Sequence, residues 1–337
     1  MEALLSEVLK THSMKDVSTR LGLCVGTIRR WQELDSVPSQ YRFDLLKILS
    51  RDVNYSEYTS KEKDQFFTPS RVAEQCWQTF IRVTGIDPNE YTFIEPSAGD
   101  GSFLRCLPSG TIGLDIEPRS DGIQMQDYLT WSPPESEGPY AVFGNPPFGL
   151  RGHLALQFIN HSYPFADYVA FILPQLFESD GKGSPRKRVV GYNLIHSEKL
   201  TTEFYTPEGT NVNVNGVFQI WSKNTVNPSY AIQAVDRSKM TVYSMSDGGS
   251  VASTRNKGMI GKCDVYLPST CFGRENMRIY DSFEELPNQK GYGIVFHEEK
   301  VEMIRKAKST DWANVCFLST NSAFNLRTSI IVTQLAD

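Results

Sequence analysis

Residues 140–148 have the sequence Tyr-Ala-Val-Phe-Gly-Asn-Pro-Pro-Phe, an apolar run that ends in two consecutive prolines. Proline fixes φ and lacks a backbone N–H, so the chain cannot continue beyond Gly144 as a helix or a central strand. The run therefore ends in a rigid turn that fixes the Asn145 amide, the Pro146 carbonyl and the Phe148 ring relative to one another. Such a set can accept both hydrogens of a planar exocyclic amine and stack on the ring that carries it. Taken alone, the stretch is equally well explained as a tight Pro-Pro turn with a core phenylalanine.

Other short apolar runs show the same pattern of a strand that ends at a polar or glycine-rich motif. Runs that alternate with turn signals and helical patterns predict buried parallel strands in an open sheet. In such sheets ligands bind at the carboxyl ends of the strands. We therefore expect an α/β fold with helices on both faces of the sheet, a helix over 71–81, and strands at 93–96, 111–115, 140–144, 168–174 and 217–221.

The first expected strand continues into Glu95-Pro-Ser-Ala-Gly-Asp-Gly-Ser-Phe103, which we expect to open a helix. Gly99 and Gly101 allow the backbone to approach a ligand where a side chain would block it. The third glycine of the dinucleotide fingerprint is missing, which counts against NAD. The segment is compatible with a nucleotide, a flavin or simply a tight turn at this strand end.

Acidic residues follow further along the chain. Asp115 ends the next strand and is placed to accept both hydroxyls of a ribose. Asp127 supplies an acceptor for an adenine amino group, and Tyr128 supplies a flat face for the ring. Singly, Asp115 is explained as a helix cap and Tyr128 as a core aromatic. Their order and position predict an adenosine-containing cofactor.

In order along the chain, five segments resemble the motifs of S-adenosylmethionine-dependent DNA adenine-N6 methyltransferases. They are Phe67-Thr-Pro69, Glu95 to Phe103, Gly113-Leu-Asp-Ile-Glu-Pro118, Asp127-Tyr-Leu129 and Asn145-Pro-Pro-Phe148, and the match covers about residues 64–222. The Phe-Thr-Pro segment precedes the glycine-rich turn, an order similar to the gamma group, whose target-recognition domain is C-terminal. The resemblance implies a Rossmann-like methyltransferase sheet, S-adenosyl-L-methionine as cofactor and a flipped-out target adenine.

The resemblance also implies a role for each motif residue. The cofactor residues would be Phe67, Thr68 and Pro69 at the methionine end, Glu95, Gly99 and Gly101 around the pocket, Asp115 at the ribose, and Asp127 and Tyr128 at the adenine. Asn145 and Pro146 would accept the target amino hydrogens while Phe148 stacks on the base. Phe148 replaces the commoner tyrosine, but stacking needs no hydroxyl. A second aromatic from a later strand covers the other face of the base in this family, and Phe218 and Trp221 both qualify.

Residues 1–57 are expected to be helical, and a short helix, a glycine-containing turn and a second helix within them resemble a helix-turn-helix. The second helix would present Arg29 and Arg30 outward and pack Ile28 and Trp31 inward. The segment is equally well explained as a DNA-contacting element and as a helical hairpin that binds nothing, since such hairpins are common.

The chain after the catalytic pattern is less informative. A Gly/Ser/Pro-rich loop carries a basic group that either contacts phosphates or is simply solvated: Lys182, Arg186, Lys187 and Arg188. We expect domains at 1–57, 58–229 and 230–337. The last is an α+β target-recognition module, with strands at 265–268, 277–280 and 293–296 and a helix near 298–308.

Composition and charge suit a globular protein of two or three domains. The 337 residues are 40% hydrophobic and 22% charged, with a net charge of −5 that argues against a sequence-blind nucleic-acid coat. No apolar run has the length of a membrane span, so no membrane partner is expected. The six cysteines form no CxxC pair, so we expect neither a disulfide framework nor a metal site, and a cytoplasmic location: Cys24, Cys76, Cys106, Cys263, Cys271 and Cys316.

Two other functions stay open at this stage. The Pro-Pro turn also suits an RNA adenine or protein-glutamine N-methyltransferase, because it serves any planar amide or amine. A non-catalytic helix-turn-helix regulator with a methyltransferase-like fold is the second alternative, but it would not need Asn145, Asp115 and the glycine-rich turn together. The helix-turn-helix and the C-terminal module favour double-stranded DNA as partner, with a cognate restriction endonuclease as a candidate second partner and the oligomeric state left open.

Overall fold

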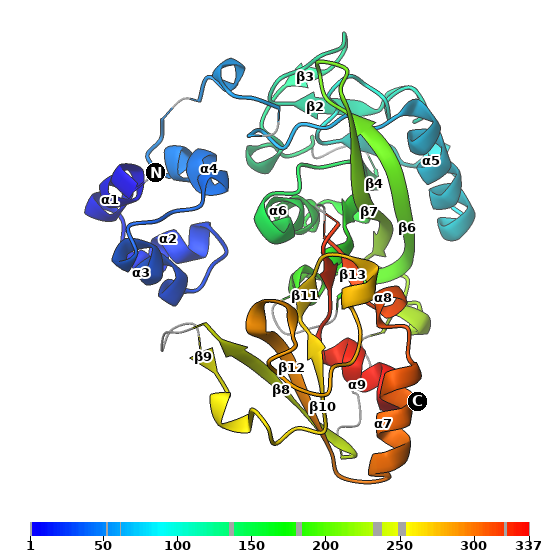
Figure 1. Ribbon diagram of the computed structural model, residues 1–337. Helices are drawn as coiled ribbons and strands as arrows, with labels where there is room; N and C mark the ends of the chain where they lie inside the picture. Colours follow the sequence, from blue (N-terminus) through cyan, green and yellow to red (C-terminus); the bar gives the residue numbers. More distant parts are fainter. Residues whose placement is uncertain are drawn as a thin grey trace. The chain divides into compact units, whose positions relative to one another are not determined.

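The computed structural model describes residues 2–51, 53–60, 62–134, 138–179, 184–231, 238–248, 254–319 and 322–336. The chain divides into two compact units, coloured along the sequence in Figure 1. Unit 1 comprises Met1–Phe171 and Glu203–Val212, and unit 2 comprises Ile172–Thr202 and Asn213–Asp337. Lys182, one of the expected phosphate contacts, lies outside the described residues.

Unit 1 begins with four short helices, as expected for residues 1–57. They are α1 (Glu2–Thr11), α2 (Met14–Arg20), α3 (Val25–Glu33) and α4 (Arg42–Ile48). Gly22, with φ of 60°, lies in the turn between α2 and α3. Ile28 and Trp31 are buried in the helical core while Arg29 and Arg30 are exposed, which confirms the predicted faces of α3.

A seven-stranded sheet follows, in the Rossmann-like order β3-β2-β1-β4-β5-β7-β6. The pairs β1–β2, β1–β4, β2–β3 and β4–β5 are parallel. The strands of the sheet are β1 (Thr92–Glu95), β2 (Ile112–Asp115), β3 (Gln124–Met125), β4 (Tyr140–Gly144), β5 (Ala166–Pro174), β6 (Asn193–Tyr205) and β7 (Asn211–Ser222). The five strands predicted in this region are present as β1, β2, β4, β5 and β7. A hydrogen bond from Thr206 N to Thr210 O closes the turn between β6 and β7, so these neighbouring strands form a hairpin.

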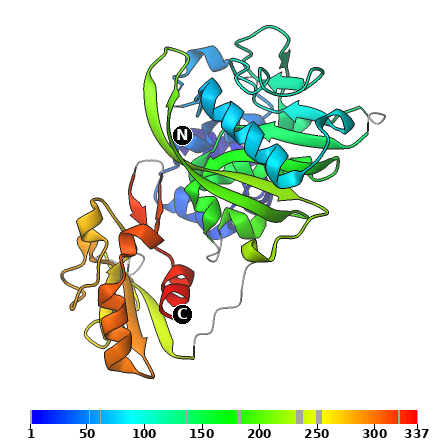
Figure 2. The same cartoon turned by 90° about the vertical axis from the view of Figure 1, so that its right-hand side faces the viewer.

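Helices cover both faces of the unit 1 strands. In Figures 1 and 2, α5 (Ser70–Thr84) and α6 (His153–Ser162) lie on opposite faces. The Trp77 ring of α5 packs edge-on against Phe93 of β1 and Phe143 of β4, with ring centroids 5.2 and 5.8 Å apart. This apolar layer leaves the carboxyl ends of the strands as the edge where polar side chains gather.

The helix expected to open within residues 95–103 does not form. Residues 98–107 make successive turns instead, because N–H groups bond alternately three and four residues back: Cys106 to Phe103 O and Arg105 to Gly101 O. Pro108 follows, and a proline favours extended backbone before it. The glycine-rich segment is therefore a compact loop.

The described part of unit 2 contains, besides most of β6 and β7, two small antiparallel sheets with three α-helices. The four-stranded sheet has the order β10-β12-β8-β9, and the three-stranded sheet has the order β11-β14-β13. The bounds are β8 (Met240–Asp247), β9 (Thr254–Arg255), β10 (Val265–Pro268), β11 (Thr270–Cys271), β12 (Lys290–Phe296), β13 (Phe317–Leu318), β14 (Phe324–Asn325), α7 (Lys300–Ser309), α8 (Trp312–Val315) and α9 (Thr328–Ala336). Buried residues such as Ile294 and Trp312 join β8, β10, β11, β12 and the three helices in one core. A second cluster of buried residues includes Tyr266 and Phe283.

Two predicted strands of this region, 265–268 and 293–296, and the helix near 298–308 are confirmed as β10, β12 and α7. The strand expected at 277–280 is wrong. A 3-10 turn at Arg274–Asn276 redirects the chain just before it, and only Tyr280 then pairs, in an isolated bridge with Tyr266. Among the described residues, none of the helices is both long enough and apolar enough to span a bilayer.

Candidate functional site

A pocket lies in unit 1 where β1, β2 and β4 end, and we call it the strand-end pocket. Residues that directly follow these strands line it: Pro96 and Ser97 after β1, Ile116 after β2, and Asn145 after β4. Six of the predicted site residues line it together, namely Phe67, Gly99, Asp115, Asp127, Tyr128 and Asn145. The expectation that the motifs converge at the carboxyl edge of the sheet is thus met for these six.

The Asn145 amide is held with its oxygen available. Its Nδ2 donates to Thr68 Oγ1 at 3.2 Å and more weakly to Phe66 O at 3.5 Å. Its Oδ1 is buried and has no hydrogen-bond partner. Buried polar atoms in folded proteins are almost always paired, so a vacant acceptor that lines a pocket points to a donor on a ligand. Thr68, which is 3% exposed, therefore orients Asn145 rather than lining the pocket itself.

Contacts on both sides of the Pro-Pro turn, at Gly144 before it and at Gly149 after it, hold the turn in place. A Cβ on Gly144 would lie 2.1 Å from Glu95 Oε1, so glycine is required where the strand passes over this buried carboxyl. Beyond the turn, Asp64 Oδ2 accepts the Gly149 N–H at 2.7 Å. Pro146 is buried and Phe148 is partly exposed, and neither lines the strand-end pocket.

Glu95 lies behind the pocket and not in its lining. Burial raises the pKa of this carboxyl well above its usual value, and the charges of Asp115 and Asp100 add to the effect, whereas the nearby backbone N–H of Asn145 opposes it. Neither carboxyl oxygen has a partner of normal hydrogen-bond geometry. A neutral Glu95 that supports the turn fits these surroundings better than a charged ligand-binding group.

Asp115 ties the glycine-rich loop to β2. Its Oδ2 accepts the Gly99 N–H and its Oδ1 accepts the Glu117 N–H, both at 2.7 Å. Each oxygen keeps a second lone pair for a ribose hydroxyl. Burial raises the pKa of Asp115, and the two N–H donors oppose that effect. Gly101 lies outside the pocket lining, with the side chains of Arg105 and Ser120 nearby.

Gly99 is also where Phe67 approaches. At φ of 53°, a Cβ on Gly99 would lie 2.8 Å from the Phe67 ring, so a side chain there is excluded both by backbone conformation and by space. Phe67 is itself held by Tyr205, through backbone hydrogen bonds of 2.7 and 3.1 Å in both directions and an edge-on ring contact. Pro69 precedes the first residue of α5.

Tyr205 is a site residue that the sequence did not reveal. Its hydroxyl donates to Asp100, in the glycine-rich loop, while its backbone pairs with Phe67. It thereby joins two of the motifs. No local pattern marks it, because its partners lie more than one hundred residues earlier in the chain.

At the other end of the pocket, Asp127 Oδ1 accepts the Leu129 N–H at 3.1 Å. Tyr128 is 1% exposed, and its hydroxyl bonds Ser162 at 2.7 Å, so its ring is packed into the fold and lines the pocket only in part. Ile116 is 41% exposed and lines the pocket as an apolar face. Its place directly after Asp115 is a signal that sequence reasoning overlooked.

The remaining predicted residues lie elsewhere. Phe218 and Trp221 are buried in unit 2, at 0% and 2% exposure. Arg186 is occupied internally, since it donates to the carbonyls of Glu178 and Tyr230, whereas Lys187 is exposed. The stacking role and the DNA-backbone roles, including those of Arg188, Arg29 and Arg30, remain predictions.

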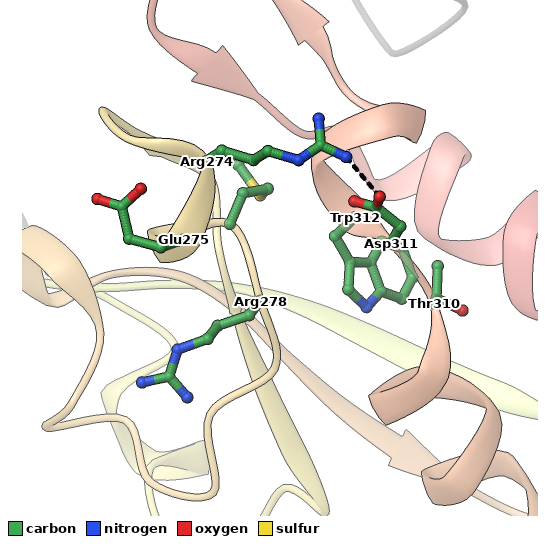
Figure 3. Close-up of a pocket in the computed structure, with 7 residues that line it drawn as sticks. Arg274, Glu275, Arg278, Thr310, Asp311 and Trp312 are labelled. Carbon is green, nitrogen blue, oxygen red and sulfur yellow. Dashed lines mark hydrogen bonds and ion pairs between the residues drawn. The ribbon is translucent and has the colours of Figure 1, made fainter.

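Unit 2 has a second hollow, which is shallow and open to solvent. Figure 3 shows the ion pair between Arg274 and Asp311 in this hollow, with Trp312 beside the pair and the Arg278 side chain directed away from the pair. None of the sequence motifs contributes to this hollow. We therefore assign the chemistry to the strand-end pocket.

The polar groups that line the strand-end pocket suit S-adenosylmethionine. Asp115 and Asp127 would hold the ribose and the adenine amine, and the Gly99 backbone leaves room beside Phe67. Pockets that enclose ligands of this size span roughly 300 Å³ or more, so the strand-end pocket, at about 140 Å³, would enclose only part of the cofactor. Asn145, whose buried Oδ1 has no partner, lines the same pocket at the end of β4.

No protein-family model and no curated protein matches the sequence. Similar solved structures include a candidate RNA methyltransferase from Pyrococcus horikoshii, with 16% identity, 47% of this chain and 86% of that chain covered, and a TM-score of 0.36. A candidate hemolysin from Lactococcus lactis has 8% identity, coverages of 46% and 88%, and a TM-score of 0.32. A SAM-dependent methyltransferase from Anabaena variabilis has 12% identity, coverages of 45% and 94%, and a TM-score of 0.27. The chain is thus similar to S-adenosylmethionine-dependent methyltransferases over about half its length, but scores this low carry no argument about substrate.

Proposed function

We propose that the protein is an S-adenosylmethionine-dependent DNA methyltransferase that acts on the N6 amino group of a flipped-out adenine, as part of a restriction-modification system. The observation that carries this proposal is the buried Asn145 Oδ1 without a partner, in the pocket that Asp115 and Asp127 also line. A vacant acceptor suits an amine, and two carboxylates suit the hydroxyls and amino group of an adenosine cofactor.

The chain's residues act on the amine by orienting it. Asn145 Oδ1 and the Pro146 carbonyl accept its two hydrogens, so the nitrogen lone pair, otherwise delocalised into adenine, is localised and directed. Thr68 fixes the amide in this orientation through its hydrogen bond to Nδ2. Bound S-adenosylmethionine supplies an electrophilic methyl group at its sulfonium. Positioning of this kind is the main source of rate in such a transfer.

The target base must leave the duplex to reach the turn. Unstacking costs a few kcal/mol, and stacking on an aromatic side chain returns about 1–3 kcal/mol per base. Phe148 follows the Pro-Pro turn and is partly exposed, so its ring is accessible for this role. Phe218 or Trp221 would have to become accessible to cover the second face.

Duplex DNA is favoured as substrate by the exposed Arg29 and Arg30 on α3, the second helix of the helix-turn-helix-like pair. Arginines on such a helix suit contact with bases or phosphates of the major groove. The C-terminal part of the chain, residues 230–337, is proposed to recognise the target sequence.

The test is incubation with methyl-labelled S-adenosylmethionine and unmethylated genomic DNA, followed by nucleoside analysis. We expect labelled N6-methyladenine. Labelled N4-methylcytosine would correct the target base, because the same turn serves any planar amine. Absence of label in DNA would turn attention to RNA or protein as substrates, and binding of DNA without transfer to any of the three would favour the non-catalytic regulator.

A further inference from the structure

The N-terminal helices contribute a wall to the strand-end pocket, although they lie outside the segment that resembles methyltransferases. Leu45 and Ile48 of α4 are buried in the helical core. The opposite face of α4 presents Phe43, Asp44 and Lys47 to the pocket. One side of α4 therefore packs in the helical core, and another side of the same helix lines the pocket.

Lys47 forms an ion pair with Asp127, the residue proposed to hold the cofactor's adenine. Its Nζ donates to Asp127 Oδ2 at 2.7 Å, and the two side chains are 43% and 25% exposed. Burial alone would lower the pKa of Lys47, but the hydrogen bond and charge of Asp127 outweigh it and raise that pKa. Lys47 is therefore an ammonium, with two further N–H groups to donate.

An ammonium donor beside a carboxylate acceptor matches one edge of adenine. The adenine amino group is a donor, and a ring nitrogen next to it, N1 on one side and N7 on the other, is an acceptor. Asp127 can accept from the amino group while Lys47 donates to the adjacent ring nitrogen. Hypoxanthine, which has a carbonyl oxygen in place of the amine, would set that oxygen against the Asp127 carboxylate.

Phe43 and Ile116 add apolar surface to this end of the pocket. The Phe43 ring is fixed by Tyr58, edge-on with centroids 4.9 Å apart, and by Tyr55 at 5.4 Å. Ile116 is 41% exposed. These two side chains offer a flat purine apolar surface to pack against while the charged pair binds its edge.

We propose that Lys47 is a specificity-determining residue of the cofactor site, which together with Asp127 recognises the amino group and the neighbouring ring nitrogen of the cofactor's adenine. The N-terminal helical segment is then a structural part of the cofactor site as well as a candidate DNA-binding element. This inference rests on the proposed function, because it takes the pocket to hold an adenosine cofactor.

The test measures binding by calorimetry of S-adenosylhomocysteine to the full-length protein. Lys47→Met should weaken binding about 10- to 100-fold, the loss of one hydrogen bond to a charged group. Lys47→Arg, which keeps a charged donor, should bind within a fewfold of the wild type. Lys10→Met, an exposed lysine on α1, is the matched control and should bind like the wild type.

Analogues of the ligand separate recognition from a structural effect. S-inosylhomocysteine should bind the wild type at least about tenfold more weakly than S-adenosylhomocysteine. The 1-deaza and 7-deaza forms of S-adenosylhomocysteine identify the ring nitrogen: one of them should lose about tenfold with the wild type and nothing further with Lys47→Met. A variant that had only distorted the pocket would still distinguish the two deaza forms as the wild type does.

The outcomes that overturn the inference are distinct from those that overturn the function. Unchanged binding by Lys47→Met removes Lys47 from the site, and tighter binding shows that Lys47 competes with the adenine for Asp127. Either result leaves the proposed function standing. A wild-type protein that binds no S-adenosylhomocysteine refutes the proposed function, and this inference with it.

Discussion

Asp44 makes the stability of the N-terminal helical segment depend on pH. Burial raises the pKa of this carboxyl from 3.8 to about 6, and the charge of Lys47 opposes the shift only in part. The folded protein therefore holds the Asp44 proton more tightly than the unfolded chain does. Folding loses stability as the pH rises from about 4 to about 6, and the whole penalty is present above pH 6.

The size of the penalty follows from the two pKa values. A difference of about 2 corresponds to about 3 kcal/mol, and solvent screening of a partly buried group reduces it to about 1–3 kcal/mol. Asp44→Asn removes the titration while keeping the side chain's shape. We expect this variant to be more stable than the wild type by that amount at pH 7.5 and nearly equal to it at pH 4.

Thermal unfolding at the two pH values measures the effect. At about 2–4 °C per kcal/mol, Asp44→Asn should raise Tm by several degrees at pH 7.5. The exposed Asp121→Asn is the control and should leave Tm unchanged at both. An equal gain at pH 4 and pH 7.5, or a loss of stability at pH 7.5, would refute the reasoning.

Two further predictions concern the strand-end pocket. Thr68→Val removes the 3.2 Å hydrogen bond to Asn145 Nδ2, so methyl transfer should slow about 2- to 10-fold while the affinity for S-adenosylhomocysteine stays unchanged. Thr68→Ser keeps the hydroxyl and should retain the wild-type rate. Equal rates for the two variants would show that Thr68 does not orient Asn145. Gly99→Ala places a methyl group against the Phe67 ring and should weaken S-adenosylhomocysteine binding at least about tenfold. Gly110 also has a positive φ but lies in open space, so Gly110→Ala should not weaken binding. Similar losses in the two variants would mean that backbone strain, and not the contact with Phe67, is responsible.

The sheet was predictable because each of its central strands is a short apolar run with a turn signal at its end. Ile94 of β1 and Val142 of β4 are fully buried, as continuous apolar runs in a parallel sheet require. The convergence of Asp115 and Asn145 on one pocket follows from the same pattern, since parallel strands end at one edge.

The parts that were not predictable depend on contacts between distant residues. Lys47 and Asp127 are separated by 80 positions, and Tyr205 and Asp100 by 105, so no local pattern reports either pair. The strand expected at 277–280 failed for a related reason. Its apolar pattern suited a strand, but only Tyr280 has a partner strand within reach, in the bridge with Tyr266.

The most direct test of the central claim is the effect of Asn145→Ala on methyl incorporation into unmethylated genomic DNA, measured beside S-adenosylhomocysteine binding by the same variant. Asn89→Ala, in an exposed turn, is the matched control. The account predicts that Asn145→Ala lowers incorporation by at least about 100-fold, because a preorganised acceptor is lost from the site of reaction, while cofactor affinity stays within about twofold. Incorporation near the wild-type rate would contradict it, because the amine would then be oriented without Asn145.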